Sequence, residues 1–76
     1  MRPARADLTA ARHCIAGRLV AEELTPVQRE LVVSVLHARG YPDARIAAVT
    51  RMSSYTTGRI RLRLGLTPHR PAAAGC

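Results

Sequence analysis

The arginine residues are the side chains of this chain with the clearest chemical potential, and they are unevenly distributed. Residues 1–43 hold six arginines and all five acidic residues, whereas the remainder holds six arginines and no acid. A guanidinium donates forked hydrogen bonds to phosphate and to guanine. With a formal net charge of +7, the chain is predicted to bind a polyanion through its C-terminal half. Nucleic acid fits that charge better than an anionic membrane surface.

Other reactive side chains are few and are not spaced for chemistry. The histidines and cysteines are not spaced like a usual set of metal ligands; they are His13, Cys14, His37, His69 and Cys76. No Ser/His/Asp set, carboxylate pair or glycine-rich phosphate loop occurs, and 76 residues leave little chain to build a pocket around one. We therefore expect no enzyme activity, no metal and no cofactor, and we expect Cys14 to be a small buried residue.

The composition indicates a small helical protein of the cytoplasm. Phe and Trp are absent, so Leu, Val, Ile, Ala and Met must form the core, as is typical of packed helices. Neither a disulfide framework nor a signal-peptide core nor an apolar run of about 18 residues occurs, which predicts a cytoplasmic, nucleoid-associated protein. The chain has arginine but no lysine, and it has no asparagine. This composition is typical of genes from high-GC bacteria and their phages.

The elements that must position the arginines begin with a flexible basic arm, residues 1–6, and a first helix. Asp7 is placed as the N-cap of this helix, which is expected to run to about Glu23 although Gly17 weakens it. Apolar residues at three- and four-residue spacing predict its buried face: Leu8, Ala11, Ile15 and Leu19.

A second helix has strong boundary signals. Thr25 as N-cap, Pro26 at the first helical position and Gln28 as capping-box partner predict its start. Gly40 predicts its left-handed stop. Its buried stripe, beside an additional apolar Val33, is predicted to consist of Val27, Leu31, Val32, Val35 and Leu36.

Two shorter helices follow. One begins at Pro42 or Asp43 and runs to about Thr50, and Ser53 caps the other over residues 54–64, which Gly65 ends. The side chains expected toward the core in this region are Met52, Thr56, Thr57, Ile60 and Leu64. The predicted fold is all-α, with a domain over residues 7–66 that holds a trihelical helix-turn-helix unit (26–66) and an additional N-terminal helix, followed by a disordered tail (67–76).

A run of residues between Gly40 and Ile60 resembles the helix-turn-helix of small bacterial and phage transcriptional regulators and of recombinase DNA-binding domains. The residues that carry the resemblance are Ile46, Ala47, Met52, Ser53, Thr57 and Ile60. It implies that Ala47 is small because two helices cross there, and that Met52 fills the space beneath the turn. The chain departs from the pattern at Arg51, where a left-handed glycine is usual and another residue costs about 1 kcal/mol, and at Thr57, where Val or Ile is usual.

The resemblance implies which residues contact DNA. The last helix is the recognition helix, whose base-reading residues are Ser54, Tyr55 and Arg59. The residues expected at the DNA backbone are Arg45, Arg51, Arg61 and Arg63. Gly58 either permits close approach to a phosphate or base, or is incidental.

The expected function is sequence-specific binding of double-stranded DNA, as a small transcriptional regulator or a control protein of a phage or mobile element. A homodimer is expected, because two half-sites one helical turn apart raise the specificity of so small a reader. The first helix then either packs on the second or forms the dimer contact. The alternative is a protein-interaction module that binds RNA polymerase, a sigma factor or another regulator. No membrane binding is expected, because the first helix lacks the Trp and Phe of an interfacial anchor.

Overall fold

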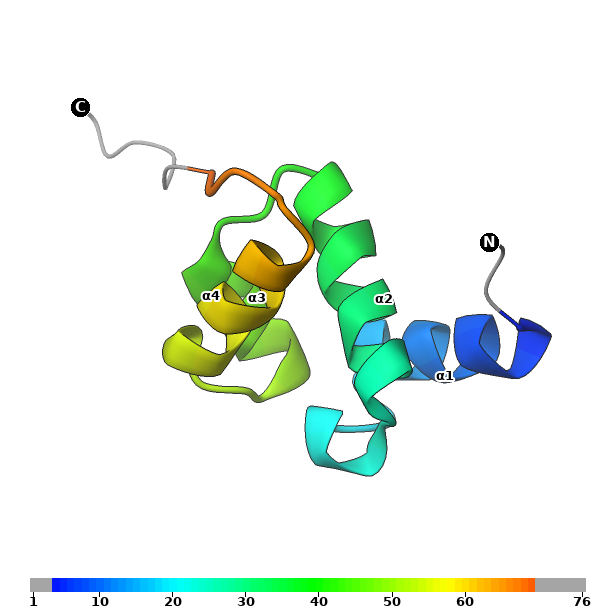
Figure 1. The fold of residues 1–76 in the computed structure, drawn as a ribbon. Helices are drawn as coiled ribbons and strands as arrows, with labels where there is room; N and C mark the ends of the chain where they lie inside the picture. Colours follow the sequence, from blue (N-terminus) through cyan, green and yellow to red (C-terminus); the bar gives the residue numbers. More distant parts are fainter. Residues whose placement is uncertain (1–3, 70–76) are drawn as a thin grey trace.

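The computed structural model describes residues 4–69, and over this range the chain is all-α, as predicted (Figure 1). The helices are α1 (Arg5–Ile15), η1 (a short 3₁₀ helix, Ala21–Glu23), α2 (Pro26–Ala38), α3 (Asp43–Thr50) and α4 (Ser54–Arg63). No strand occurs among these residues. None of the helices in this range is both long and apolar enough to span a membrane.

The start of α1 lies earlier than predicted. The helix begins at Arg5 without a side-chain cap, rather than behind Asp7. The Asp7 carboxylate instead accepts a hydrogen bond of 3.0 Å from Gln28 Nε2 on α2, and so joins the two helices. The predicted arm therefore overlaps α1, and residues 1–3 of that arm lie outside the described residues.

The end of α1 also lies earlier than predicted, at Ile15. Gly17 adopts φ +84°, a left-handed conformation that leaves the helical path, and the chain then turns toward η1. The expected continuation of the helix to about Glu23 is therefore wrong. The predicted apolar face is buried only in part: Ala11 is buried, Ile15 and Leu19 are half-buried, and Leu8 is exposed.

The boundaries of α2 are those that the sequence predicts. Thr25 Oγ1 accepts a hydrogen bond of 3.2 Å from the backbone N–H of Gln28, and Gln28 Oε1 accepts one of 3.0 Å from the backbone N–H of Thr25. This confirms the capping box. Gly40 follows the helix at φ +88°. The predicted apolar residues of α2 are not all buried to the same extent. Val32, Val33 and Leu36 are buried, whereas Leu31 and Val35 are half-buried. Val27, in the first turn, is exposed.

The core lies where α1, α3 and α4 pack against α2. Its buried cluster consists of Ala11, Cys14, Leu24, Val32, Val33, Leu36, Ile46 and Ile60. Cys14 is fully buried, as predicted, and burial together with the nearby Glu23 carboxylate raises the pKa of its thiol. Figure 1 shows α1 crossing α2 and extending away from α3 and α4. Helix α1 therefore has the packing role that was one of its two expected uses.

The turn between α3 and α4 has the predicted geometry. Arg51 adopts φ 62° and ψ 30°, the left-handed conformation expected at this position, and it is the only residue other than glycine with positive φ among residues 4–69. Ser53 Oγ caps α4 by accepting a hydrogen bond of 3.0 Å from the backbone N–H of Thr56. Ala47 is buried and its neighbour Ala48 is exposed, which agrees with the predicted register of α3.

The segment after α4 returns to the end of α2. His37 Nε2 lies 2.6 Å from the backbone oxygen of Thr67, and the rings of His37 and His69 stack with their centroids 4.1 Å apart. Residues 67–69 of the predicted tail thus contact α2. Residues 70–76 of that tail lie outside the described residues.

Candidate nucleic-acid interface

Helix α4 has one face packed in the core and one face in solvent. Thr57, Ile60 and Arg61 are buried on the first face. Tyr55, Arg59 and Leu62, at spacings of four and three residues, share the opposite face and are all exposed. We call these three residues the outward face of α4. Tyr55 is 73% exposed and Leu62 is 68% exposed, so neither contributes much to the core.

The three predicted base-reading residues all lie at the surface. Ser54 is exposed at the first position of α4, and Tyr55 and Arg59 belong to its outward face. The guanidinium carbon of Arg59 lies 5.8 Å from the centroid of the Tyr55 ring, which is within range of a cation–π interaction. The structure therefore places the Arg59 guanidinium beside the ring of Tyr55.

The prediction that Arg61 points outward is wrong. Arg61 is only 8% exposed, and its Nε lies 2.9 and 3.0 Å from the two carboxylate oxygens of Asp43 on α3. Its Nη1 donates a further hydrogen bond of 2.9 Å to the backbone oxygen of Leu66. Arg61 follows Thr57 by one helical turn and therefore shares its inward face. These partners make Arg61 a structural residue that fixes α4 against α3 and is not available to a DNA phosphate.

The other three arginines expected at the DNA backbone are accessible. Arg45 and Arg51 are exposed, and the Arg45 guanidinium carbon lies 4.2 Å from the centroid of the Tyr41 ring. The Arg63 side chain is 59% exposed and forms an ion pair of 3.2 Å with Glu30 on α2. Exposed ion pairs of this kind contribute about 1 kcal/mol or less. Arg63 can therefore exchange this carboxylate for a phosphate at little cost.

Helix α4 also contains two threonines and a glycine, at positions 56 to 58. Thr56, predicted to point to the core, is exposed, and its hydroxyl lies 3.0 Å from Ser53 Oγ. Thr57 is fully buried, and its hydroxyl has no hydrogen-bond partner among the described residues 4–69. A Cβ added at Gly58 would lie 3.4 Å from Asp43 Oδ2. The small residue at Gly58 thus stands beside the carboxylate that Arg61 binds, a contact within the chain that neither sequence interpretation included.

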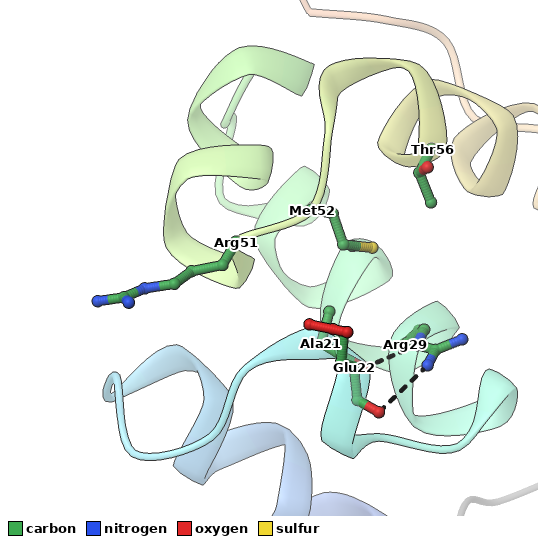
Figure 2. A pocket seen from close by; sticks show the side chains of 6 residues that line it. All are labelled: Ala21, Glu22, Arg29, Arg51, Met52 and Thr56. Carbon is green, nitrogen blue, oxygen red and sulfur yellow. Dashed lines mark hydrogen bonds between the residues drawn. The ribbon is translucent and has the colours of Figure 1, made fainter.

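A groove of about 300 Å³ lies beside the start of α4, between η1 and the turn that precedes α4 (Figure 2). Its lining consists of Ala21, Glu22, Arg29, Arg51, Met52 and Thr56. Figure 2 shows Met52 pointing toward the groove and the Arg51 side chain extending away from it. Arg29 is occupied within the chain, because its Nε donates to the backbone oxygen of Ala21 at 2.7 Å. The lining holds one carboxylate and neither histidine nor cysteine, so it offers no acid–base pair.

Metal binding receives no support within residues 4–69, where no group of three or more His, Cys, Asp or Glu side chains is placed to hold a metal ion. Leu62 was not among the predicted site residues, because the prediction took only the two arginines that flank it. The spacing of Tyr55, Arg59 and Leu62 was the signal that could have found it. The partner that it missed is Asp43, which lies 18 residues before Arg61.

The geometry and the charge of α4 carry the functional argument for this chain. No protein-family model matches it, and neither curated proteins nor solved structures give a match. The function of the outward face is therefore inferred from its exposed side chains, from the groups that they can bind and from the contacts that fix α4 in the fold.

Proposed function

We propose that the chain is a sequence-specific DNA-binding protein that inserts α4 into the major groove of double-stranded DNA. The observation that carries this proposal is the outward face of α4, where an exposed arginine stands between two exposed side chains on a helix without any acidic residue. The major groove of B-DNA admits an α-helix, and its base edges present a distinct pattern for each base pair. The inward face of α4 packs in the core and Arg61 pairs with Asp43, so the outward face has a fixed orientation toward solvent.

The proposal assigns a role to Ser54, to Tyr55 and to each exposed arginine of α3, of α4 and of the turn between them. Arg59 donates two hydrogen bonds to guanine O6 and N7, while Tyr55 and Ser54 contact neighbouring bases or their phosphates. Arg45, Arg51 and Arg63 bind phosphates and fix the orientation of the protein on the duplex. The backbone N–H groups at the start of α4 add a positive partial charge at the same end as Arg51. The helix-turn-helix resemblance of residues 40–60 supports the same arrangement.

In the cell, this activity suits a small transcriptional regulator or a control protein of a phage or mobile element, working in the cytoplasm at the nucleoid. We propose that it binds as a homodimer. The outward face of one α4 can address only a few base pairs, and a second copy at a half-site about 34 Å away multiplies the specificity. A dimer predicts a binding site with two-fold symmetry.

The proposal is tested by selecting bound sequences from a pool of random duplexes and then titrating the winning duplex at several salt concentrations. We expect a short site with two symmetric halves. If Arg45, Arg51 and Arg63 each bind a phosphate in one protomer, the logarithm of the affinity should fall with the logarithm of salt concentration with a slope of about −3 or steeper. The proposal would be refuted if the pool shows no enriched sequence. It would also be refuted if the affinity for the enriched duplex does not change with salt concentration.

A second candidate function is a protein-interaction module for RNA polymerase, a sigma factor or another regulator. The observation that favours it is the exposure of Tyr55 and Leu62, because aromatic and large aliphatic side chains are frequent anchors in protein interfaces. The salt titration separates the two candidates. A mainly apolar interface should respond little to salt, whereas several arginine–phosphate contacts should respond steeply.

A further inference from the structure

Leu62 is the aliphatic residue of the outward face of α4. Large apolar side chains are exposed at four places among residues 4–69, namely Leu8, Val27, Tyr55 and Leu62. Single exposed residues of this kind are ordinary on protein surfaces. Leu62 differs because it is aligned with Arg59 and Tyr55 on the only helix of the described chain that has arginine on its outward face and no acidic residue.

We propose that Leu62 reads the C5 methyl group of a thymine, so that the binding site contains a T·A pair close to the guanine contacted by Arg59. This inference depends on the proposed DNA-binding function and specifies its base preference. A leucine side chain has no donor or acceptor, and the thymine methyl is the one apolar feature that a base pair of unmodified DNA presents in the major groove. Against any other base edge, Leu62 would cover polar groups without pairing them, which is unfavourable.

The spacing on α4 fits this arrangement. Residues 55 and 62 are about 10 Å apart along a helix axis, which corresponds to about three base-pair steps. Arg59 lies between them on the same face. A helix lying along the groove can therefore place Tyr55, Arg59 and Leu62 at neighbouring base pairs, with Leu62 next to the pair that Arg59 reads.

The same residues fit a protein partner less well. Tyr55 and Leu62 are separated by the charged Arg59, and Arg63 follows one turn after Arg59, so the outward face is not a continuous apolar patch. Arginine itself is frequent in protein interfaces, but the fully buried centre of an interface is more apolar than this face. A row of cationic and apolar side chains matches the major groove better, where guanine acceptors and a thymine methyl group can lie at neighbouring base pairs.

The test uses the selected duplex with each thymine replaced in turn by deoxyuridine, which lacks only the methyl group. Affinity is measured by fluorescence anisotropy for the unaltered chain, for Leu62→Ala and for Leu8→Ala, a matched control for an exposed leucine on α1. The unaltered chain and Leu8→Ala should bind about fourfold more weakly when one particular thymine is replaced, the effect expected for one buried methyl group. Leu62→Ala should not distinguish thymine from uracil at that position.

A second arm uses modified cytosine. With a C·G pair at the same position, methylation of cytosine at C5 should strengthen binding of the unaltered chain about fourfold and leave Leu62→Ala unchanged, because the methyl group occupies the same place in the groove. Equal binding of all thymine and uracil duplexes by the unaltered chain would overturn the role of Leu62 and leave DNA binding standing. Discrimination retained in Leu62→Ala would do the same. Failure to bind any duplex at low salt would overturn both proposals.

Discussion

The inward and outward faces of α4 use arginine for opposite purposes. Arg61 is buried on the inward face, where it binds the Asp43 carboxylate and the backbone oxygen of Leu66. Arg59 is exposed on the outward face, where its neighbour is the ring of Tyr55 and no carboxylate of residues 4–69 is within salt-bridge distance. The comparison shows that a cluster of arginines on one helix is not a single functional unit. An arginine on the inward face stabilises the fold, and an arginine on the outward face is free to bind a partner.

The division also explains how the outward face is positioned. A helix of ten residues is too short to be stable alone, so α4 depends on its tertiary contacts. Thr57 and Ile60 anchor it in the core, and the Arg61 ion pair with α3 fixes its rotation. The two faces should therefore respond differently to substitution: changes on the inward face should alter stability, and changes on the outward face should alter DNA affinity.

The largest effect is expected for Arg61→Ala. This substitution leaves the Asp43 carboxylate and the Leu66 carbonyl without their partner, and we expect it to lower the free energy of unfolding by about 3 kcal/mol. Arg59→Ala is the matched control, and as an exposed change it should stay within about 0.5 kcal/mol. Urea denaturation followed by circular dichroism measures both. Equal stabilities of the two variants would contradict the division between the faces.

An intermediate effect, of opposite sign, is expected for Thr57→Val. Valine has nearly the shape of threonine but lacks the hydroxyl that is buried here without a partner. We expect the free energy of unfolding to rise by about 1 kcal/mol. Thr56→Val, at the exposed neighbouring position, should change it by less than about 0.5 kcal/mol. A loss of stability in Thr57→Val would mean that the hydroxyl is hydrogen-bonded in solution.

The smallest effect is expected for Gly58→Ala. Alanine is favoured over glycine inside a helix by about 1 kcal/mol, and the added Cβ, 3.4 Å from Asp43 Oδ2, should offset part of that gain. The net rise in the free energy of unfolding should be about 0.5 kcal/mol. DNA affinity should remain within about threefold, or about 0.7 kcal/mol, because the Cβ points toward Asp43. A large loss of affinity in a stable variant would instead show that DNA approaches the backbone at Gly58.

Local signals in the sequence were sufficient for the start and end of α2 and for the cap of α4, whereas the left-handed conformation at Arg51 was implied by the helix-turn-helix resemblance. Each of the local signals depends on residues within one turn of the chain, as in the reciprocal hydrogen bonds of Thr25 and Gln28. The end of α1 was missed because the apolar spacing continues to Leu19, although Gly17 has already turned the chain. Periodicity alone does not show where a helix ends.

The candidate site likewise has residues that local sequence signals predict and residues that depend on contacts with other helices. The exposure of Ser54, Tyr55 and Arg59 follows from the position of the Ser53 cap, which fixes the register of α4. The burial of Arg61 could not be predicted from α4 alone, because it depends on a carboxylate on another helix. The predicted inward face was displaced to one side, so that it included the exposed Thr56 and left out the buried Arg61, and Leu62 was overlooked between two arginines.

The most direct test of the central claim is the affinity of Arg59→Ala and Arg63→Ala for the selected duplex and for variants of it at each position. We predict that Arg59→Ala loses about 1 to 3 kcal/mol of specific binding and relaxes the base preference at one position. Arg63→Ala should weaken binding to all duplexes alike and reduce the salt slope by about one unit for each protomer, or about two units for the proposed dimer. If both folded variants bind every duplex as tightly as the unaltered chain at low salt, the outward face of α4 does not contact DNA.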